Sequence, residues 1–350
     1  MNASTPSVLS LPCPPGGVDE FLSAPPDSVV AAAAGLPAPV LVLGAGGKMG
    51  LHLSLMLRNA LTAVGRADAR VIAVSRFSTL RDRDVFTEAG IETIACDLSV
   101  AGEVAALPEA PSVFFLAGVK FGTSSSPQLL EQMNVVMPRL VAERFQRSRI
   151  VAFSTGCVYP FVPVAGAGAT EEVPVSPVGE YAQSCLRREE AFAEVSARAG
   201  TRVTLIRLNY SVEFRYGVLV DIASRVLARQ PVDVTMGHVN VIWQRDAVAQ
   251  TILALDAARS PAAPLNIAGA AVLRVRDIAA DFGRLFGIEP VIVGVEAPTA
   301  WLNDATRSHR LFGAPPTSTD TMERWIAAWL SLGGETWGKP TGFEKRDGKF

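Results

Sequence analysis

The chain has 350 residues, of which 49% are hydrophobic and 19% are charged, and its formal net charge is −2. This composition is typical of a folded protein with a large hydrophobic core and excludes an intrinsically disordered chain. The small net charge argues against nucleic acid or an anionic membrane as the main partner.

Residues 1–36 predict a proline-containing arm followed by one helix over residues 18–34. The apolar stretch of residues 29–43 is interrupted by Pro37 and Pro39 and falls short of the ~20 apolar residues that a membrane-spanning helix needs. No basic region followed by an apolar segment marks a secretion signal, and the cysteines form no CxxC pair. We therefore expect a cytoplasmic protein with reduced thiols.

Residues 40–50 read VLVLGAGGKMG, four apolar residues that enter a glycine-rich loop, and residues 51–61 continue as a helix. Glycine permits the tight turn, the close approach of the backbone to a pyrophosphate, and the packing of helix on strand. The helix N-terminus also offers free N–H groups to phosphates. The sequence thus predicts a dinucleotide site that includes Gly44, Gly46, Gly47, Lys48, Met49 and Gly50. For Lys48, a phosphate contact and an exposed loop residue are both open.

Apolar strands then alternate with helical segments up to residue 208. The strands are expected at residues 71–74, 92–98, 112–117, 149–154 and 203–208, and the main helices at 129–145 and 181–199. Near-continuous apolar strands separated by helices predict a parallel sheet covered on both faces. We therefore expect an α/β fold in which residues 37–208 form a Rossmann-type, doubly wound dinucleotide-binding domain.

The pattern loosens after residue 208. Helices are expected at residues 219–229, 247–258, 275–286 and 321–332, with strand-like segments at 264–268 and 291–295. We interpret residues 209–332 as a smaller C-terminal substrate-binding lobe, partly interleaved with the first domain and lying over the strand ends. The glycine-rich tail, residues 333–350, is expected to pack across a lobe or a neighbouring subunit.

A series of short motifs follows in a characteristic order. They are Gly44-Gly47-Gly50, Asp97-Leu98, residues 116–120 (LAGVK), Asn134-Val135, residues 153–159 (FSTGCVY), Tyr181, residues 242–249 and residues 265–269 (LNIAG). Over roughly residues 38–295 this order resembles the extended short-chain dehydrogenase/reductase superfamily, often labelled NAD-dependent epimerase/dehydratase. The resemblance implies an NAD(P) cofactor, a carbohydrate-like substrate and, by analogy, a homodimer.

The resemblance also assigns roles to individual residues. It implies that Asp97 and Leu98 contact adenine and that Ala117, Gly118 and Lys120 border the cofactor. It further implies that Tyr181 is the acid/base group and that Thr155 orients the substrate oxygen. The alternative for Thr155 is a hydroxyl at the strand end that caps the backbone.

The end of the second strand bears on the choice of cofactor. Ser75 and Arg76 stand where NAD-preferring sites place an acidic residue that binds the ribose 2′-hydroxyl. An acid would repel a 2′-phosphate, whereas arginine offers a bidentate donor. We therefore favour NADP over NAD, with a solvated surface cation as the alternative interpretation of Arg76.

The largest departure from the superfamily pattern is at Cys185, where the resemblance implies a lysine four residues after the catalytic tyrosine. A free tyrosine has a pKa of ~10, and a cation at about 4 Å is worth about 4 kcal/mol at an effective dielectric of about 20, roughly three pK units. A thiol cannot replace that effect. Tyr181 is therefore weakened as a base more than as a proton donor, and carbonyl reduction suffers less than alcohol oxidation.

One hypothesis is that another cation replaces the lysine that is absent at position 185. Lys120 follows the fourth strand and is predicted to hold the ribose and supply the missing charge, with a surface lysine as the alternative. Arg187 and Arg188 lie further along the helix of Tyr181. One of them could also reach into the site, but we favour a solvated helix face for both.

The predicted substrate contacts are Asn209, Arg215 and Trp243. A sugar nucleotide would require cations for its diphosphate, which Arg215 and Arg245 could provide, but the supply is small. A sugar, polyol or sugar acid is equally consistent. The histidines show no ligand spacing, so we expect no metal.

Together these observations predict an NAD(P)-dependent oxidoreductase or epimerase that acts on a hydroxyl or ketone of a carbohydrate-like substrate. The alternative is a non-catalytic NAD(P)-binding sensor or partner protein that kept the fold and lost the lysine, which the fold alone does not exclude.

Overall fold

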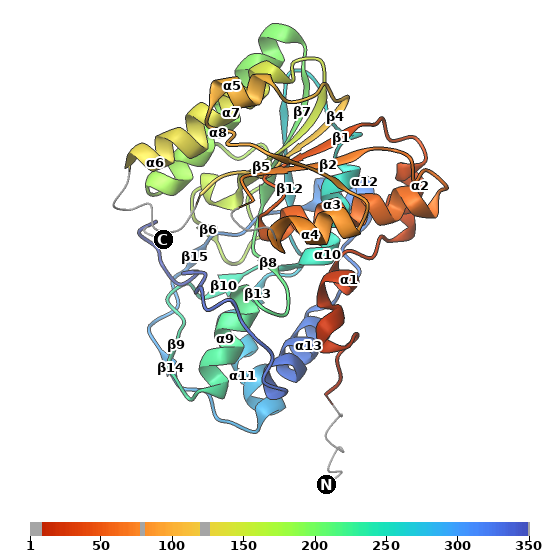
Figure 1. The fold of residues 1–350 in the computed structure, drawn as a ribbon. Coiled ribbons are helices and arrows are strands. Elements are labelled where there is room, and N and C mark those ends of the chain that lie inside the picture. The colour runs from red at the N-terminus through yellow and green to blue at the C-terminus, as the bar shows by residue number, and fades with distance from the viewer. Residues whose placement is uncertain (1–8, 78–80, 120–126, 349–350) are drawn as a thin grey trace.

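The computed structural model describes residues 9–77, 81–119 and 127–348 (Figure 1). Within them, seven strands form a central sheet in the order β12-β7-β5-β4-β1-β2-β3. They are β1 (Val40–Leu43), β2 (Val71–Ser75), β3 (Glu92–Ala95), β4 (Ser112–Phe115), β5 (Arg149–Thr155), β7 (Arg202–Leu208) and β12 (Ala263–Ile267). Every neighbouring pair is parallel, which confirms the predicted Rossmann-type sheet.

Helices cover both faces of this sheet (Figure 1). One face carries α5 (Ala101–Ala105), α7 (Met137–Arg144) and α8 (Glu180–Ala199), and the other α2 (Asp27–Ala33), α3 (Lys48–Ala63) and α10 (Gln244–Leu253). The alternation along β1 explains the arrangement, because Val40 and Val42 pack with the side chains of α3, whereas Leu41 and Leu43 pack with those of α7 and α8. Two buried faces account for the continuous apolar runs in the sequence.

The seventh strand comes from residues that the sequence analysis placed in the second lobe. β12 pairs with β7, with Ile267 beside Leu208, and forms one edge of the sheet. This edge is closed to a further strand, because Pro264 has no N–H and the N–H of Asn266 donates to the carboxylate of Glu171 at 2.9 Å. The chain therefore returns to the sheet after it has built part of the lobe.

The single helix predicted for residues 18–34 is wrong, because the chain forms two helices there. They are α1 (Val18–Leu22) and α2, and Pro25 and Pro26 lie between them. A proline has no N–H to donate and its ring clashes with the preceding turn, so the helix ends before this pair.

The segment predicted as one helix over residues 129–145 contains three consecutive parts. These are α6 (Pro127–Glu131), a π-helical turn η2 (Gln132–Val136) and α7. Among the described residues, no helix is both long and apolar enough to cross a membrane.

The second lobe lies below the sheet in Figure 1. Its helices are α9 (Val218–Leu227), α11 (Val275–Phe286) and α13 (Thr319–Ser331), which pack against one another. Short strand pairs complete it: β9 (Val232–Asp233) with β14 (Ile292–Val293), and β10 (His238–Val239) with β13 (Leu273–Arg274). An additional helix, α12 (Thr306–Phe312), lies between α11 and α13 in the sequence and packs beside β12.

The C-terminal tail returns across this lobe toward the start of α8. The N–H of Trp337 donates to the carbonyl of Arg215 at 3.1 Å, and Thr341 donates through its N–H and its hydroxyl to the carboxylate of Asp221. Gly348 then lies against Gly179, so closely that a Cβ on either glycine would collide with the backbone of the other segment. The tail therefore packs on its own chain.

The buried carboxyl of Glu323 in α13 makes the stability of the fold depend on pH. Glu323 is 6% exposed, and burial, assisted by the charge of Asp320, raises its pKa from the ordinary 4.5 to about 7. Because the folded-state pKa is the higher one, the stabilisation is complete below about pH 4.5 and is lost as the pH rises through about 7. The rise corresponds to about 3 kcal/mol.

We therefore expect Glu323→Gln to be up to about 3 kcal/mol more stable than the unsubstituted chain at pH 8, and to differ little at pH 4.5. Urea unfolding at both pH values measures this. Glu289→Gln is the control, because Glu289 is exposed and the same substitution there should have a small effect at both pH values. An equal change at both pH values would contradict the prediction.

Candidate functional site

The glycine-rich loop lies between β1 and α3. Gly44 has a φ of 91°, in the left-handed region, and a Cβ there would lie 2.6 Å from the backbone nitrogen of Ala117. At Gly50 a Cβ would lie 2.5 Å from the carbonyl oxygen of Gly44. Glycine is thus required both for the turn and for the packing of the helix start against it.

A cavity of about 310 Å³ opens beside this loop. It brings together nine of the predicted cofactor residues: Gly44, Gly46, Gly47, Ser75, Arg76, Asp97, Leu98, Ala117 and Gly118. These come from the ends of β1, β2, β3 and β4, because the carboxyl ends of parallel strands meet at the same edge of a sheet.

Of two polar side chains at this cavity, Asp97 is hydrogen-bonded within the protein and Arg76 is exposed. The carboxylate of Asp97 accepts hydrogen bonds from the hydroxyl and the N–H of Ser99, which lowers the pKa of Asp97. The guanidinium of Arg76 is exposed at the end of β2. It is therefore available to a ligand.

A second cavity, of about 290 Å³, contains Tyr181, Thr155 and Asn209 together with Lys48 and Met49 from the start of α3. Both cavities are lined by Leu116 and Gly118, so they adjoin each other. Helix α8 contributes Tyr181, the end of β5 contributes Thr155, and the segment after β7 contributes Asn209.

Tyr181 lies in the first turn of α8. Burial, followed by the neighbouring thiols of Cys185 and Cys157, raises the pKa of its phenol well above the usual range, whereas Arg188 acts in the opposite direction. The phenol is therefore protonated at neutral pH. In this state it can donate a proton to a bound oxygen.

Thr155 presents a second hydroxyl to the same cavity. Its oxygen accepts a hydrogen bond from the N–H of Cys157 at 3.2 Å. Because this bond uses only the oxygen lone pair, the hydroxyl hydrogen can be donated to a substrate oxygen.

Lys48 is held between aromatic rings, an arrangement that neither sequence interpretation anticipated. Its Nζ lies 2.8 Å from the ring centroid of Tyr216 and 4.1 Å from that of Trp337. These cation–π contacts connect the glycine loop to the second lobe and to the C-terminal tail. The tail therefore helps to form this end of the cavity, to which Thr341 also contributes.

Of the predicted substrate contacts, Arg215 and Trp243 do not line this cavity. The guanidinium of Arg215 donates to the carboxylates of Asp19, at 2.7 Å, and Glu213, at 3.2 Å. Trp243 is fully buried, edge-on to the ring of Phe214. Arg245, the other cation considered for a diphosphate, donates to the carbonyl of Ala24.

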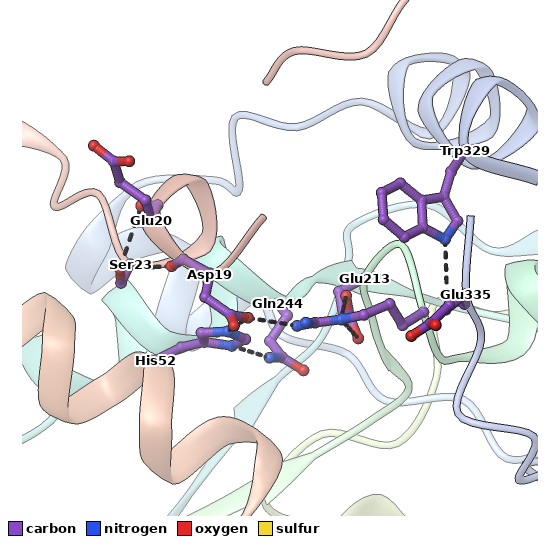
Figure 2. A network of polar contacts seen from close by, with 9 residues as sticks. Asp19, Glu20, Ser23, His52, Glu213, Gln244, Trp329 and Glu335 are labelled. Carbon is purple, nitrogen blue, oxygen red and sulfur yellow. Dashed lines mark hydrogen bonds and ion pairs between the residues drawn. The ribbon is translucent and has the colours of Figure 1, made fainter. Parts of the chain in front are cut away.

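Figure 2 shows a polar network that includes Asp19, His52, Gln244 and Glu213. Arg215 joins it through its hydrogen bonds to Asp19 and Glu213. The ring of His52, from α3, contacts Asp19 through Nε2 at 2.9 Å and the amide of Gln244 through Nδ1 at 2.6 Å. The hydrogen bond with His52 is the largest cause of the lowered pKa of Asp19. The network thus joins α1, α3 and α10 beside the cavity, which Gln244 lines, and it engages the guanidinium of Arg215 in contacts within the protein.

The prediction for Lys120 falls outside the described residues. Next to it in sequence, Val119 is held by the amide of Asn134, which accepts from its N–H and donates to its carbonyl at 3.1 Å. The same amide donates to the hydroxyl of Ser184 on α8. Asn134 therefore connects the segment after β4 to the helix of Tyr181.

The favoured interpretation of Arg188 as solvated is wrong, and the alternative that one of the two arginines reaches into the site holds for Arg188. Its side chain is 6% exposed and lines the cavity of Tyr181, whereas Arg187 forms an exposed ion pair with Glu131. Residue 188 follows residue 181 by two helical turns, so both lie on the same face of α8. This spacing is the sequence signal that could have identified it.

The cysteines of the site are buried and unbridged. Within the described part of the chain, no group of three or more His, Cys, Asp or Glu side chains could hold a metal ion.

A comparison with known families agrees with this geometry. The sequence profile of the NAD dependent epimerase/dehydratase family matches residues 40–268. The chain belongs to this family. The resemblance inferred from the motifs is thereby confirmed. No curated protein sequence matches the chain.

Solved structures with the same fold include three that were determined with NAD. MoeE5 in complex with UDP-glucose and NAD has a TM-score of 0.68 at 20% identity, over 85% of this chain and 99% of that one. UDP-glucuronic acid 4-epimerase from Bacillus cereus, with NAD, has a TM-score of 0.68 at 16% identity, over 84% and 98%. The dTDP-glucose 4,6-dehydratase DesIV from Streptomyces venezuelae, a double mutant with NAD and DAU bound, has a TM-score of 0.69 at 17% identity, over 84% and 97%.

Proposed function

We propose that the chain is an NAD(P)-dependent enzyme that exchanges hydride with a hydroxyl-bearing or ketone carbon of a carbohydrate-like substrate. One observation carries the proposal: the hydroxyl-bearing side chains of Tyr181 and Thr155, from two different elements, line one cavity that adjoins the cavity of the glycine loop. A proton donor beside a dinucleotide cradle is the arrangement that such a reaction needs.

The residues of the first cavity fit a nicotinamide dinucleotide. The glycine loop leaves room for a pyrophosphate at the start of α3, where a Cβ at Gly50 would disrupt the packing. Asp97 and Leu98 would border the adenine, and Ala117 and Gly118 the remainder of the dinucleotide. When bound, this group supplies hydride acceptance and donation at the nicotinamide.

In the second cavity, the Tyr181 phenol would give its proton to the substrate oxygen while Thr155 donates a hydrogen bond to the same atom. Its raised pKa keeps Tyr181 protonated at neutral pH, which supports carbonyl reduction over alcohol oxidation. Asn209, whose amide donates to Asn240 at 2.6 Å, would border the substrate.

The charges around the cavity support a substrate without a diphosphate. Arg215 and Arg245 are engaged with Asp19 and with the carbonyl of Ala24. The cavity has a volume of about 290 Å³, and the two cations among its described lining residues are engaged: Lys48 is stacked on two rings, and Arg188 donates to Phe153 and Asn134. Such a cavity offers little to two phosphates. We therefore favour a free sugar, polyol or sugar acid.

The end of β2 supports NADP as the cofactor. We expect Arg76→Asp to weaken NADPH binding by roughly 10- to 100-fold and to spare NADH, because a charge-assisted hydrogen bond is worth about 1.5–3 kcal/mol. Nucleotide fluorescence titration measures both affinities. Arg70→Asp, at the opposite end of the same strand, is the control. Unchanged or tighter NADPH binding in Arg76→Asp would refute the preference.

The experiment that tests the function is a turnover assay of the purified chain. NADPH and NADH are each combined with keto-sugars, sugar acids and polyols, and separately with UDP- and dTDP-hexoses, while absorbance and product NMR are followed. Turnover with a free carbohydrate is expected. Tight nucleotide binding without turnover in every combination would instead favour the non-catalytic sensor.

A further inference from the structure

Arg188 occupies a position in the cavity that nothing in the motif pattern assigns to it. Its guanidinium donates through Nη1 to the carbonyl of Phe153 at 3.1 Å, and through Nη2 to the side-chain oxygen of Asn134. Gly118 lies directly against it, since a Cβ at that position would collide with Nη2. The guanidinium is therefore enclosed between the end of β5, the turn η2 and the segment after β4.

This buried cation has no carboxylate partner within the described part of the chain. Both of its hydrogen-bond acceptors are neutral, and its Nε is buried without a hydrogen-bond partner among those residues. The adjacent Glu189 is engaged by Ser154 and Arg207 instead. An uncompensated buried charge is unfavourable by several kcal/mol, and a negative charge that forms beside it would reduce this cost.

The side chain of Arg188 extends toward the part of α8 that begins with Tyr181. Long side chains in a helix lean toward the N-terminus and cover the preceding turn. Arg188 thus extends toward the turn that contains Ser184 and Cys185, and it lines the same cavity as Tyr181. The other ionisable groups that act on the phenol are the thiols of Cys185 and Cys157, and neither can contribute a positive charge.

We propose that Arg188 is a positioning residue that supplies, from the next turn of α8, the positive charge that Cys185 cannot provide, and so stabilises the Tyr181 phenolate that forms when the proton leaves. The inference rests on the proposed function of Tyr181 as the proton donor. Arginine remains charged throughout the pH range of folded proteins, so the effect persists wherever the enzyme works.

The test follows the ionisation of Tyr181 directly. Ring-fluorinated tyrosine, whose phenol ionises at lower pH, replaces the four tyrosines, and Tyr181→Phe identifies the ¹⁹F resonance of interest. We expect Arg188→Gln to move the titration midpoint of this resonance to higher pH by about one unit or more. Arg187→Gln, which removes an exposed arginine from the same helix, is the matched control and should leave the midpoint in place.

A double variant that moves the positive charge from residue 188 to residue 185 tests the proposal if Arg188→Gln alone does not fold. In Cys185→Lys/Arg188→Gln, the gained cation should offset the lost one, and the midpoint should stay near that of the unsubstituted chain. If Arg188 had no effect on the phenol, the same double variant would lower the midpoint by about one unit or more. That result, or an unmoved midpoint in a folded Arg188→Gln, would overturn the inference.

The titration also separates this inference from the proposed function. Where the unsubstituted chain turns over, kcat of Arg188→Gln should fall by about tenfold or more, in line with a one-unit change in the phenol. A chain that binds nucleotide without turnover would refute the function, while the ¹⁹F midpoints would still decide whether Arg188 acts on Tyr181.

Discussion

Tyr181→Phe is expected to lower kcat for carbonyl reduction by about 10²- to 10⁴-fold, the usual contribution of a positioned proton donor. The substitution removes one hydroxyl and keeps the ring that lines the cavity, so the dinucleotide affinity should stay unchanged. Steady-state kinetics with NADPH and the best substrate of the panel, together with nucleotide titration, measure the two quantities.

The raised pKa of Tyr181 also predicts how the reduction and oxidation rates change with pH. Because burial raises the pKa of the Tyr181 phenol well above its usual range, the proton-donating form persists from neutral to alkaline pH. The reduction rate should therefore stay level through neutral pH, whereas the reverse oxidation should increase with pH. In Tyr181→Phe the residual rates should lose this dependence.

Tyr210→Phe is the matched control, because Tyr210 lines the same cavity and its phenol pKa is also raised by burial. Its hydroxyl has no assigned role in the proton transfer, so kcat should change little. Equal losses in the two variants would mean that the cavity requires polar groups in general, and the assignment of Tyr181 as the proton donor would fail.

The sheet and the glycine loop were predictable because their causes are local. A strand buried on both faces reads as a run such as residues 40–43, and the turn after it requires glycine at positions 44 and 50 for steric reasons that the structure displays. The family followed from several such local motifs in a fixed order.

The contacts around the substrate cavity were less predictable because they join distant parts of the chain. Arg215 was expected to contact a substrate, yet it pairs with Glu213 and with Asp19, and Asp19 is 196 residues away. No local pattern reveals that a helix near the N-terminus supplies this charge. The same holds for Lys48, whose aromatic neighbours come from the second lobe and from the tail.

Arg188 and β12 differ from Arg215 and Lys48, because the sequence contained a pattern that pointed to each of them. The spacing from Tyr181 places Arg188 on the inner face of α8, and a count of helical turns would have found it. Residues 264–268 were recognised as strand-like, but periodicity gives no information on which sheet a strand joins.

The second large effect is expected beneath the site, at the ion pair of Arg207 with Glu189. The side chains are 7% and 6% exposed, and the guanidinium of Arg207 donates to both carboxylate oxygens, at 3.0 and 2.7 Å. We expect Arg207→Met to destabilise the fold by about 3–5 kcal/mol, because it leaves the carboxylate of Glu189 buried without its cation. Urea unfolding at neutral pH measures the loss.

The double variant Arg207→Met/Glu189→Leu separates two quantities: the net contribution of the ion pair to the free energy of unfolding, and the loss of stability when only one partner is removed. Replacing a buried ion pair with apolar residues is often neutral, so the double variant should recover most of the lost stability. Its activity should nevertheless stay low, because the hydroxyl of Ser154, next to Thr155, donates to Glu189 and would lose its acceptor. Breaking the exposed pair with Arg187→Gln should change stability by no more than about 1 kcal/mol. A similarly small loss in Arg207→Met would show that solvent reaches Glu189, and the ion pair would then no longer account for the packing of β7 against α8.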